Sequence, residues 1–155
     1  MTIRYASEGD IPRLQELLRQ VCEVHHRGRP DLFRSGGSKY SDGELRELLG
    51  DPARPILVAE SGGEVLGYAF CVLQEQRGDR AMTAVRTLYI DDLCVDQACR
   101  GRHIGQALYQ QALELARRLG CYNVTLNVWS CNESALRFYE KQGLKPQKLG
   151  MEVIL

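Results

Sequence analysis

A short basic turn with two glycines stands near the middle of the chain. It reads Arg100-Gly101-Arg102-His103-Ile104-Gly105-Gln106, follows a segment typical of a β-strand, and begins a segment with the apolar spacing of an α-helix. The first amides of a helix have no intrahelical acceptor and lie at the positive end of the helix dipole. With glycines keeping side chains away, such amides can surround a phosphate group, and Arg100 and Arg102 add positive charge. The turn therefore predicts a phosphate-bearing ligand.

The spacing of the turn leaves the ligand and one alternative role open. The dinucleotide fingerprint Gly-x-Gly-x-x-Gly is absent, and so is the Gly-Lys-Ser/Thr ending of ATP-binding loops. A helix N-terminus whose glycines only allow close packing against a sheet would show the same pattern. The residues alone are thus consistent with a phosphate site or with packing.

Other side chains could take part in acid–base chemistry. Tyr139 lies seven residues after Asn132, which places both on one face of a predicted helix. Asp91 and Asp92 are adjacent in a predicted strand, so alternation would direct them to opposite faces of the sheet. The structural alternatives are a core aromatic for Tyr139, a helix cap for Asn132, and an exposed or ion-paired carboxylate for Asp91. Glu60 and His25 are weaker candidates for a base.

The elements that must position these residues follow from hydrophobic periodicity and from turn residues. We expect strands over Thr2–Ala6, Ile56–Glu60, Val65–Gln74, Ala84–Val95, Val124–Val128 and, in the tail, Gln147–Leu155. We expect one helix that Asp10 caps and that continues to His25, and others over Asp42–Leu49, Ile104–Leu119 and Glu133–Gln142. No repeat or linker divides the chain, so the pattern predicts one α/β domain over residues 1–155 with a mixed sheet.

The composition argues against several classes of function. Twenty basic and twenty acidic side chains cancel, so the overall charge gives no reason to expect a nucleic acid as a partner. The six cysteines form no Cys-x-x-Cys pair and no Cys/His cluster with zinc-ligand spacing, and we therefore expect free thiols and no metal. No apolar run is long enough for a signal peptide or a membrane span, so we expect a soluble, cytoplasmic protein without a membrane partner.

Two segments resemble the motifs of a known family. The sequence Arg100-Gly101-Arg102-His103-Ile104-Gly105 resembles motif A of the GNAT superfamily of N-acetyltransferases, whose core is Arg/Gln-x-x-Gly-x-Gly/Ala after a strand that ends in Val. The segment from Asn132 to Leu144 resembles motif B, Asn-x-x-Ala-x-x-Phe-Tyr-x-x-x-Gly-Phe. The strand from Ile90 to Val95 is similar to that of the spermidine/spermine acetyltransferase group. The resemblance covers nearly the whole chain and implies the GNAT fold, a mixed, mostly antiparallel sheet with splayed central strands flanked by helices.

The resemblance also implies an activity and a set of roles. It implies transfer of an acetyl group from acetyl-CoA to a primary amine by direct attack, without a covalent enzyme intermediate. Tyr139 would protonate the departing CoA thiolate, and Asp91 would be the base or an anchor for a cationic substrate. The acceptor would be a small-molecule or peptide amine, and a homodimer is left open. The residues implied to contact the cofactor are Leu93, Cys94, Val95, Arg100, Gly101, Arg102, His103, Ile104, Gly105, Gln106 and Asn132.

His103 is a departure from motif A, which usually has glycine at this position. Because a helix start admits other residues, we expect the phosphate site to survive, with the imidazole directed away from the phosphates or in contact with the cofactor.

Two rival functions are weighed against the enzyme. One is a non-catalytic acyl-CoA-binding regulatory domain, which the retention of Tyr139 disfavours. The other is a nucleic-acid binder that uses the Arg-Gly-Arg sequences at 27–29 and 100–102. The zero net charge and the absence of a basic patch with interleaved aromatic residues disfavour the second rival.

Overall fold

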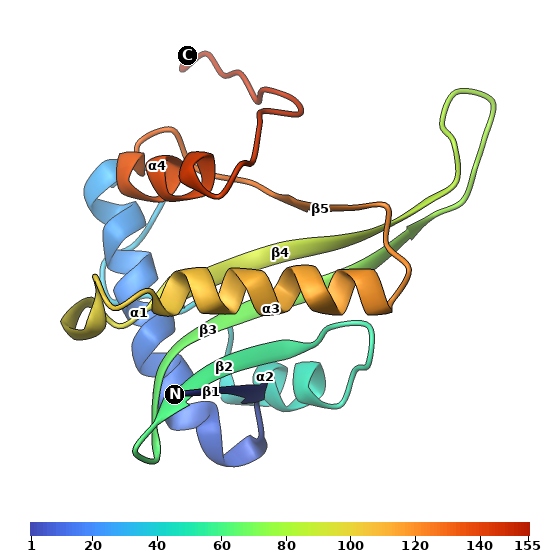
Figure 1. Ribbon diagram of the computed structural model, residues 1–155. Coiled ribbons are helices and arrows are strands. Elements are labelled where there is room, and N and C mark those ends of the chain that lie inside the picture. Colours follow the sequence, from blue (N-terminus) through green and yellow to red (C-terminus); the bar gives the residue numbers. More distant parts are fainter.

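Five strands pair in the order in which they occur along the chain, β1-β2-β3-β4-β5 (Figure 1). The first four pair antiparallel, whereas β5 lies parallel to β4. This computed structural model describes residues 1–155 and confirms the mixed, mostly antiparallel sheet. The strands are β1 (Thr2–Tyr5), β2 (Ile56–Ser61), β3 (Glu64–Gln76), β4 (Val85–Val95) and β5 (Asn123–Leu126).

Four α-helices flank the sheet, and each packs apolar side chains against it or against a neighbouring helix. They are α1 (Ile11–Gly28), α2 (Asp42–Leu49), α3 (Ile104–Arg118) and α4 (Glu133–Lys141). Helices α1 and α2 share an apolar cluster with Tyr68 and Phe70 of β3 on one face of the sheet. Helix α3 packs against Leu88 and Ile90 of β4 on the other face, which is turned toward the viewer in Figure 1. None of the helices combines the length and the hydropathy that a bilayer-crossing segment needs.

A β-bulge in β4 changes which side chains face which layer. The pairing of β4 with β3 passes from Ile90 directly to Asp92, which leaves Asp91 as an extra residue without a partner. Ile90 packs against the α3 layer before the bulge, and Leu93 packs against the same layer after it. The partners of Asp91 and Asp92 both belong to the α1–α2 layer. The expectation that these carboxylates lie on opposite faces is therefore wrong, because alternation holds only where the pairing is regular.

The sheet opens where β4 continues past the end of β5. Pairing between the two strands ends at Ile90 with Leu126, so residues 91–95 of β4 have no neighbour on that side. The last strand lies slightly earlier than the expected Val124–Val128, and Figure 1 shows the chain after it diverging from β4 toward α4. The divergence agrees with the expected splay of the central strands.

The tail from Gln147 to Leu155 forms neither strand nor helix. No backbone hydrogen bond joins residues 145–155 to the rest of the chain, and Figure 1 shows this segment projecting away from the sheet. The prediction of a last strand is wrong for the isolated chain, because an alternating sequence needs a partner strand before it can form a ladder.

The start of α1 also differs in detail from the expectation. Asp10 is the residue before the helix, but its carboxylate makes no capping hydrogen bond to α1. Arg4 instead donates two hydrogen bonds to it, at 2.8 and 3.0 Å, and the Ser7 amide donates a third at 2.7 Å. A short 3-10 turn over Glu8–Asp10 already leads into the helix, so the Asp10 side chain is used to fasten β1 to it.

Candidate active site

The basic turn presents a row of free backbone amides at the start of α3. None of the N–H groups from Gly101 to Gln106 has a backbone acceptor, and the first that does is Ala107, which donates to the His103 carbonyl at 3.1 Å. Gly101 and His103 both have left-handed backbone conformations, with φ of 81° and 59°. Left-handed residues within a turn direct successive amides into a common concavity that suits an anion. The turn can therefore hold an anionic group such as a phosphate.

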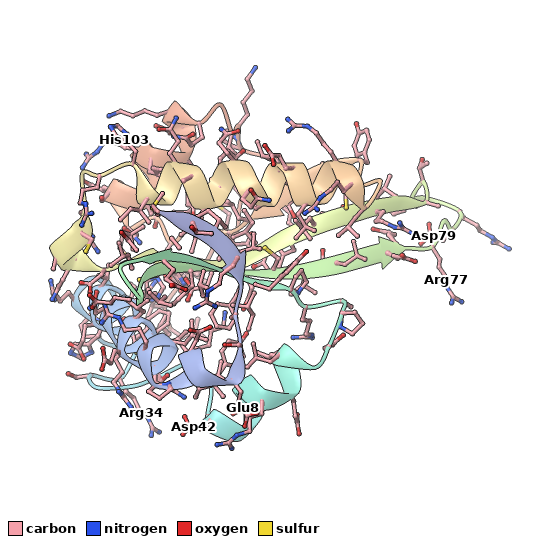
Figure 2. The ribbon with its side chains drawn as sticks, turned by 60° about the horizontal axis from the view of Figure 1, so that its bottom comes forward. Glu8, Arg34, Asp42, Arg77, Asp79 and His103 are labelled. Carbon is pink, nitrogen blue, oxygen red and sulfur yellow. The ribbon has the colours of Figure 1, made fainter.

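His103 occupies the one left-handed position in the chain that is not held by glycine. This helix start accommodates a non-glycine residue, although a Cβ is disfavoured in the left-handed region. Histidine is among the residues enriched there, which explains why the turn keeps its shape without the motif's glycine. The imidazole makes no capping bond, and Figure 2 shows His103 at the outer surface beside the start of α3.

Gly105 lies at the junction of α3, α4 and β4. A Cβ built on it would lie 3.4 Å from the Phe138 ring and 3.5 Å from Cγ2 of Val95, whereas a Cβ on Gly101 would meet open space. Close packing, the alternative role of the motif glycines, thus applies to Gly105 but not to Gly101. The same contacts place the amide row beside the open stretch of β4.

The open stretch of β4 directs two amides away from β3. The Asp96 amide donates to the Leu66 carbonyl, on the β3 side, at 2.8 Å. Successive amides of a strand point to opposite sides, so the Leu93 and Val95 amides point to the side where β5 has ended. The Cys94 side chain faces the other layer, where its thiol contacts the Leu17 carbonyl at 3.7 Å. Burial raises the pKa of the Cys94 thiol to about 12, so this thiol is not a nucleophile at neutral pH.

The two neighbouring carboxylates have different surroundings. Asp91 accepts hydrogen bonds from the Tyr40 hydroxyl at 2.6 Å and from Nζ of Lys39 at 2.9 Å. Asp92 accepts one from the Tyr68 hydroxyl at 2.8 Å. Its side chain keeps partial access to solvent although protein surrounds it densely. Burial raises the pKa of Asp92 to about 6, which brings it close to the range of a general base.

Asp92 is a functional candidate that the sequence reasoning missed. Its signal was the pair of adjacent carboxylates, but the bulge that turns both toward one layer depends on pairing with β3.

The weaker candidates for a base, Glu60 and His25, have other surroundings. Glu60 accepts a hydrogen bond from Arg4 of β1. His25 lies 4.8 Å from Phe33 between ring centroids, in an aromatic cluster that Trp129 completes at 5.2 Å from Phe33.

We predict that Asp92→Asn changes how stability depends on pH. The pKa of the folded-state carboxyl is raised from 3.8 to about 6, so the wild-type protein loses stability as pH rises through that window. Asparagine cannot ionise and removes this loss. The unfolding free energy of the variant relative to wild type should therefore grow by at most about 3 kcal/mol from the bottom to the top of the window. Urea titrations at both ends measure it, and a pH-independent difference would contradict the raised pKa.

Tyr139 lies in α4, half-buried, with its ring edge-on to Phe138 at 5.1 Å between centroids. Its hydroxyl makes no hydrogen bond within the protein and is not sealed from solvent. Burial raises the pKa of Tyr139 above its usual value, and the charge of the nearby Asp92 raises it further. The phenol is therefore neutral at pH 7 and able to donate a proton.

Asn132 caps the last helix. Its Oδ1 accepts a hydrogen bond from the Ala135 amide at 3.3 Å, as an N-cap residue does. Asn132 therefore has the helix-capping role that was the alternative to a cofactor contact. Capping uses only its oxygen, so the side-chain amide group stays free for another contact.

Comparison with known proteins identifies the family. A sequence profile of the Acetyltransferase (GNAT) family matches residues 18–144. The chain belongs to the GNAT acetyltransferase family. Members use acetyl-CoA as the acetyl donor, and this GNAT protein is accordingly an acetyltransferase.

Individual relatives span most or all of the length of this GNAT chain. It is 29% identical over 157 residues to a glucosamine 6-phosphate N-acetyltransferase of Trypanosoma brucei brucei, covering 100% of the chain and 96% of the relative. It is 28% identical over 144 residues to an L-methionine sulfoximine/L-methionine sulfone acetyltransferase of Salmonella typhimurium, covering 92% and 79%. The crystal structure of a tetramutant of the BH1408 protein of Bacillus halodurans superimposes with a TM-score of 0.96 at 30% identity, covering 100% of both chains.

Proposed function

We propose that this chain is an acetyl-CoA-dependent N-acetyltransferase that moves the acetyl group to a primary amine by direct attack. The observation that supports the proposal most is the row of free amides from Gly101 to Gln106 beside the open stretch of β4. An anionic head and an extended arm of one ligand need these two features side by side. Family membership supplies the chemistry, which is the delivery of an activated acetyl group by acetyl-CoA.

The proposed binding roles follow from the positions of the amides. Those of Gly101 to Gln106, including Ile104 and Gly105, would hold the pyrophosphate, with Arg100 and Arg102 adding charge. Those of Leu93 and Val95 would pair with the pantetheine arm as a neighbouring strand would, and would polarise the thioester carbonyl. Cys94 would contribute only its backbone, because its thiol faces α1. His103 would border the phosphates, and Asn132 would add its side-chain amide.

The proposed proton transfers use one group that donates a proton and others that accept one. Tyr139 would donate its proton to the departing thiolate sulfur, since its raised pKa keeps the phenol neutral. Asp91 would attract the protonated amine or accept its proton, with the exposed Lys39 free to turn aside. Asp92, with a pKa of about 6, is a second proton acceptor that we add to the set.

The acceptor is proposed to be a small-molecule primary amine. The two named relatives are called after an amino sugar phosphate and an amino acid analogue, both small amines. A panel of amino sugars, amino acids, polyamines and peptides, screened with acetyl-CoA for a mass gain of one acetyl group, tests this class. If acetyl-CoA binds but none of the amines in the panel causes release of the CoA thiol, the non-catalytic regulatory domain is the better description.

We predict that acetyl-CoA and CoA stabilise the fold. A ligand that binds only the native state at a hundredfold excess over its dissociation constant adds about 2.7 kcal/mol to the free energy of unfolding. Thermal melting with and without acetyl-CoA measures the effect, and pantetheine, which lacks the pyrophosphate, is the control. A melting temperature that does not move with millimolar acetyl-CoA would contradict the proposed site.

A further inference from the structure

Asp96 carries a buried charge that none of the proposed proton transfers or ligand contacts uses. The residue is 8% exposed and directly follows the open stretch of β4. Arg13 of α1 forms an ion pair with its carboxylate, which compensates the buried charge. The hydrogen bond from the Ala98 amide lowers the pKa of Asp96 although burial opposes this, and Arg13 lowers the pKa further. The side chain is therefore ionised at neutral pH.

Asp96 fixes the backbone that leads into the basic turn. Its Oδ1 accepts a hydrogen bond from the Ala98 amide at 2.9 Å, and its carbonyl oxygen accepts one from the Cys99 amide at 2.8 Å. These contacts make Asp96 the N-cap of the 3-10 turn η2 (Gln97–Cys99). Only Arg100 separates η2 from Gly101, where the row of free amides begins. The position of η2 therefore determines where that row lies.

Helix α1 holds the same turn through two side chains. Arg13 donates from Nε to the Val65 carbonyl at 2.9 Å, which fixes its guanidinium between β3 and Asp96. Gln20 accepts a hydrogen bond from the Gln97 amide at 3.1 Å and donates one to Oδ1 of Asp96 at 3.4 Å. Residues seven apart project from the same face of a helix. Figure 1 accordingly shows the segment between β4 and α3 lying against α1.

The two halves of the proposed cofactor site lie on either side of Asp96. The Leu93 and Val95 amides precede it, and the amides of Gly101 to Gln106 follow it. An extended ligand that binds both sets needs them at a fixed separation, because a hydrogen bond weakens steeply when its geometry is lost. Asp96 is suited to fix that separation and not to bind phosphate, since its carboxylate has the same charge as the ligand.

We propose that Asp96 is a positioning residue that sets the distance between the phosphate-binding turn and the open stretch of β4. It thereby determines the preference of the enzyme for a donor that carries a pyrophosphate. The inference rests on the proposed function, which assigns the free amides to the pyrophosphate. Asp96 itself contacts neither the acetyl group nor the phosphates, and its effect passes through η2 to the residues from Gly101 to Gln106.

Asp96→Ala is expected to weaken CoA binding and to leave pantetheine binding at its wild-type affinity. A hydrogen bond to a charged group is worth roughly tenfold to a hundredfold in affinity, so the Kd of CoA should rise by about that factor when the amides lose their alignment. Asp96→Asn should restore most of the affinity for CoA, because asparagine caps a turn as well as aspartate does. Calorimetric titration measures CoA binding, and an NMR titration measures the weaker binding of pantetheine.

Asp10→Ala is the matched control for the loss of a buried, paired aspartate. Asp10 is 9% exposed, forms an ion pair with Arg4 and accepts a hydrogen bond from the Ser7 amide at 2.7 Å. It fastens β1 to the start of α1 and not to η2. Its substitution should lower the melting temperature as Asp96→Ala does and leave the affinity for CoA unchanged.

Backbone NMR of the ligand-free proteins tests the positioning role without any ligand. The amide signals of Gly101 to Gln106 should shift in Asp96→Ala and stay in place in Asp10→Ala. A wild-type protein without affinity for CoA would overturn the proposed function, whereas these signals would still show whether Asp96 sets the turn.

Four results would overturn the positioning role of Asp96. They are wild-type affinity for CoA in Asp96→Ala, equal losses of affinity for CoA and for pantetheine in that variant, an equal loss of CoA affinity in Asp10→Ala, and unshifted amide signals of the turn in Asp96→Ala.

Discussion

Replacing Gly105 with glutamate is expected to abolish acetyl-CoA binding while the protein stays folded. The new side chain would start between the Phe138 ring and Val95, beside the free amides and the open stretch of β4. Its carboxylate would oppose the pyrophosphate and cancel part of the positive potential of the helix end. Like charges brought together cost several kcal/mol, and each 1.4 kcal/mol is tenfold in affinity, so we expect a loss of more than about 100-fold. A fluorescence or calorimetric titration with acetyl-CoA measures it.

The matched control is Gly105→Ala. It adds only the Cβ, at 3.4 Å from the Phe138 ring, which the ring can accommodate with a small shift. Retained binding in the alanine variant together with loss in the glutamate variant assigns the effect to charge and bulk in the cofactor's path. If alanine abolishes binding as well, Gly105 acts through packing. Wild-type affinity in the glutamate variant would show that the phosphates bind elsewhere.

Replacing Tyr139 with phenylalanine is expected to slow turnover far more than it weakens acetyl-CoA binding. The change removes the hydroxyl, which has no hydrogen-bond partner in the protein, and keeps the ring against Phe138. A positioned general acid contributes roughly 10² to 10⁴ in rate, so kcat should fall by that factor. The binding titration and the melting temperature should change little. Steady-state kinetics on an acceptor found by the amine panel measures kcat.

Tyr109→Phe is the control for a tyrosine without a catalytic role. Tyr109 lies in α3, is 5% exposed and belongs to the core. Its substitution should leave kcat near the wild-type value and affect stability only. An unchanged kcat in the Tyr139→Phe variant would make Tyr139 a packing residue and leave the acid for the departing thiolate to be found elsewhere.

Much of this protein is determined by local sequence. The helix from Ile104 and the turn before it were predictable, because apolar spacing and glycines act over only a few residues. The same holds for the Asn132 cap, whose partner Ala135 is three residues away. The family was predictable for the same reason, since its two motifs are each continuous in the sequence.

Only the tertiary structure decided how β4 presents its carboxylates. The bulge at Asp91 arises from the pairing with β3, a strand more than ten residues earlier, and no local pattern reports it. The raised pKa of Asp92 follows first from the protein packed around that carboxyl, and the charge of the adjacent Asp91 adds a smaller effect. The free amides of Leu93 and Val95 depend on where β5 ends.

The tail and His103 show most clearly what local sequence determines and what the tertiary structure determines. The alternation from Gln147 to Leu155 indicates a strand, but a strand forms only when it pairs with another strand, and the tail pairs with none in this chain. The left-handed conformation of His103 belongs to the turn between η2 (Gln97–Cys99) and α3, and no local pattern in the sequence indicates it. Local sequence thus determined which segments are regular and which motif they carry. The fold determined which strands meet and which polar groups are left free, because those depend on contacts between residues far apart in the chain.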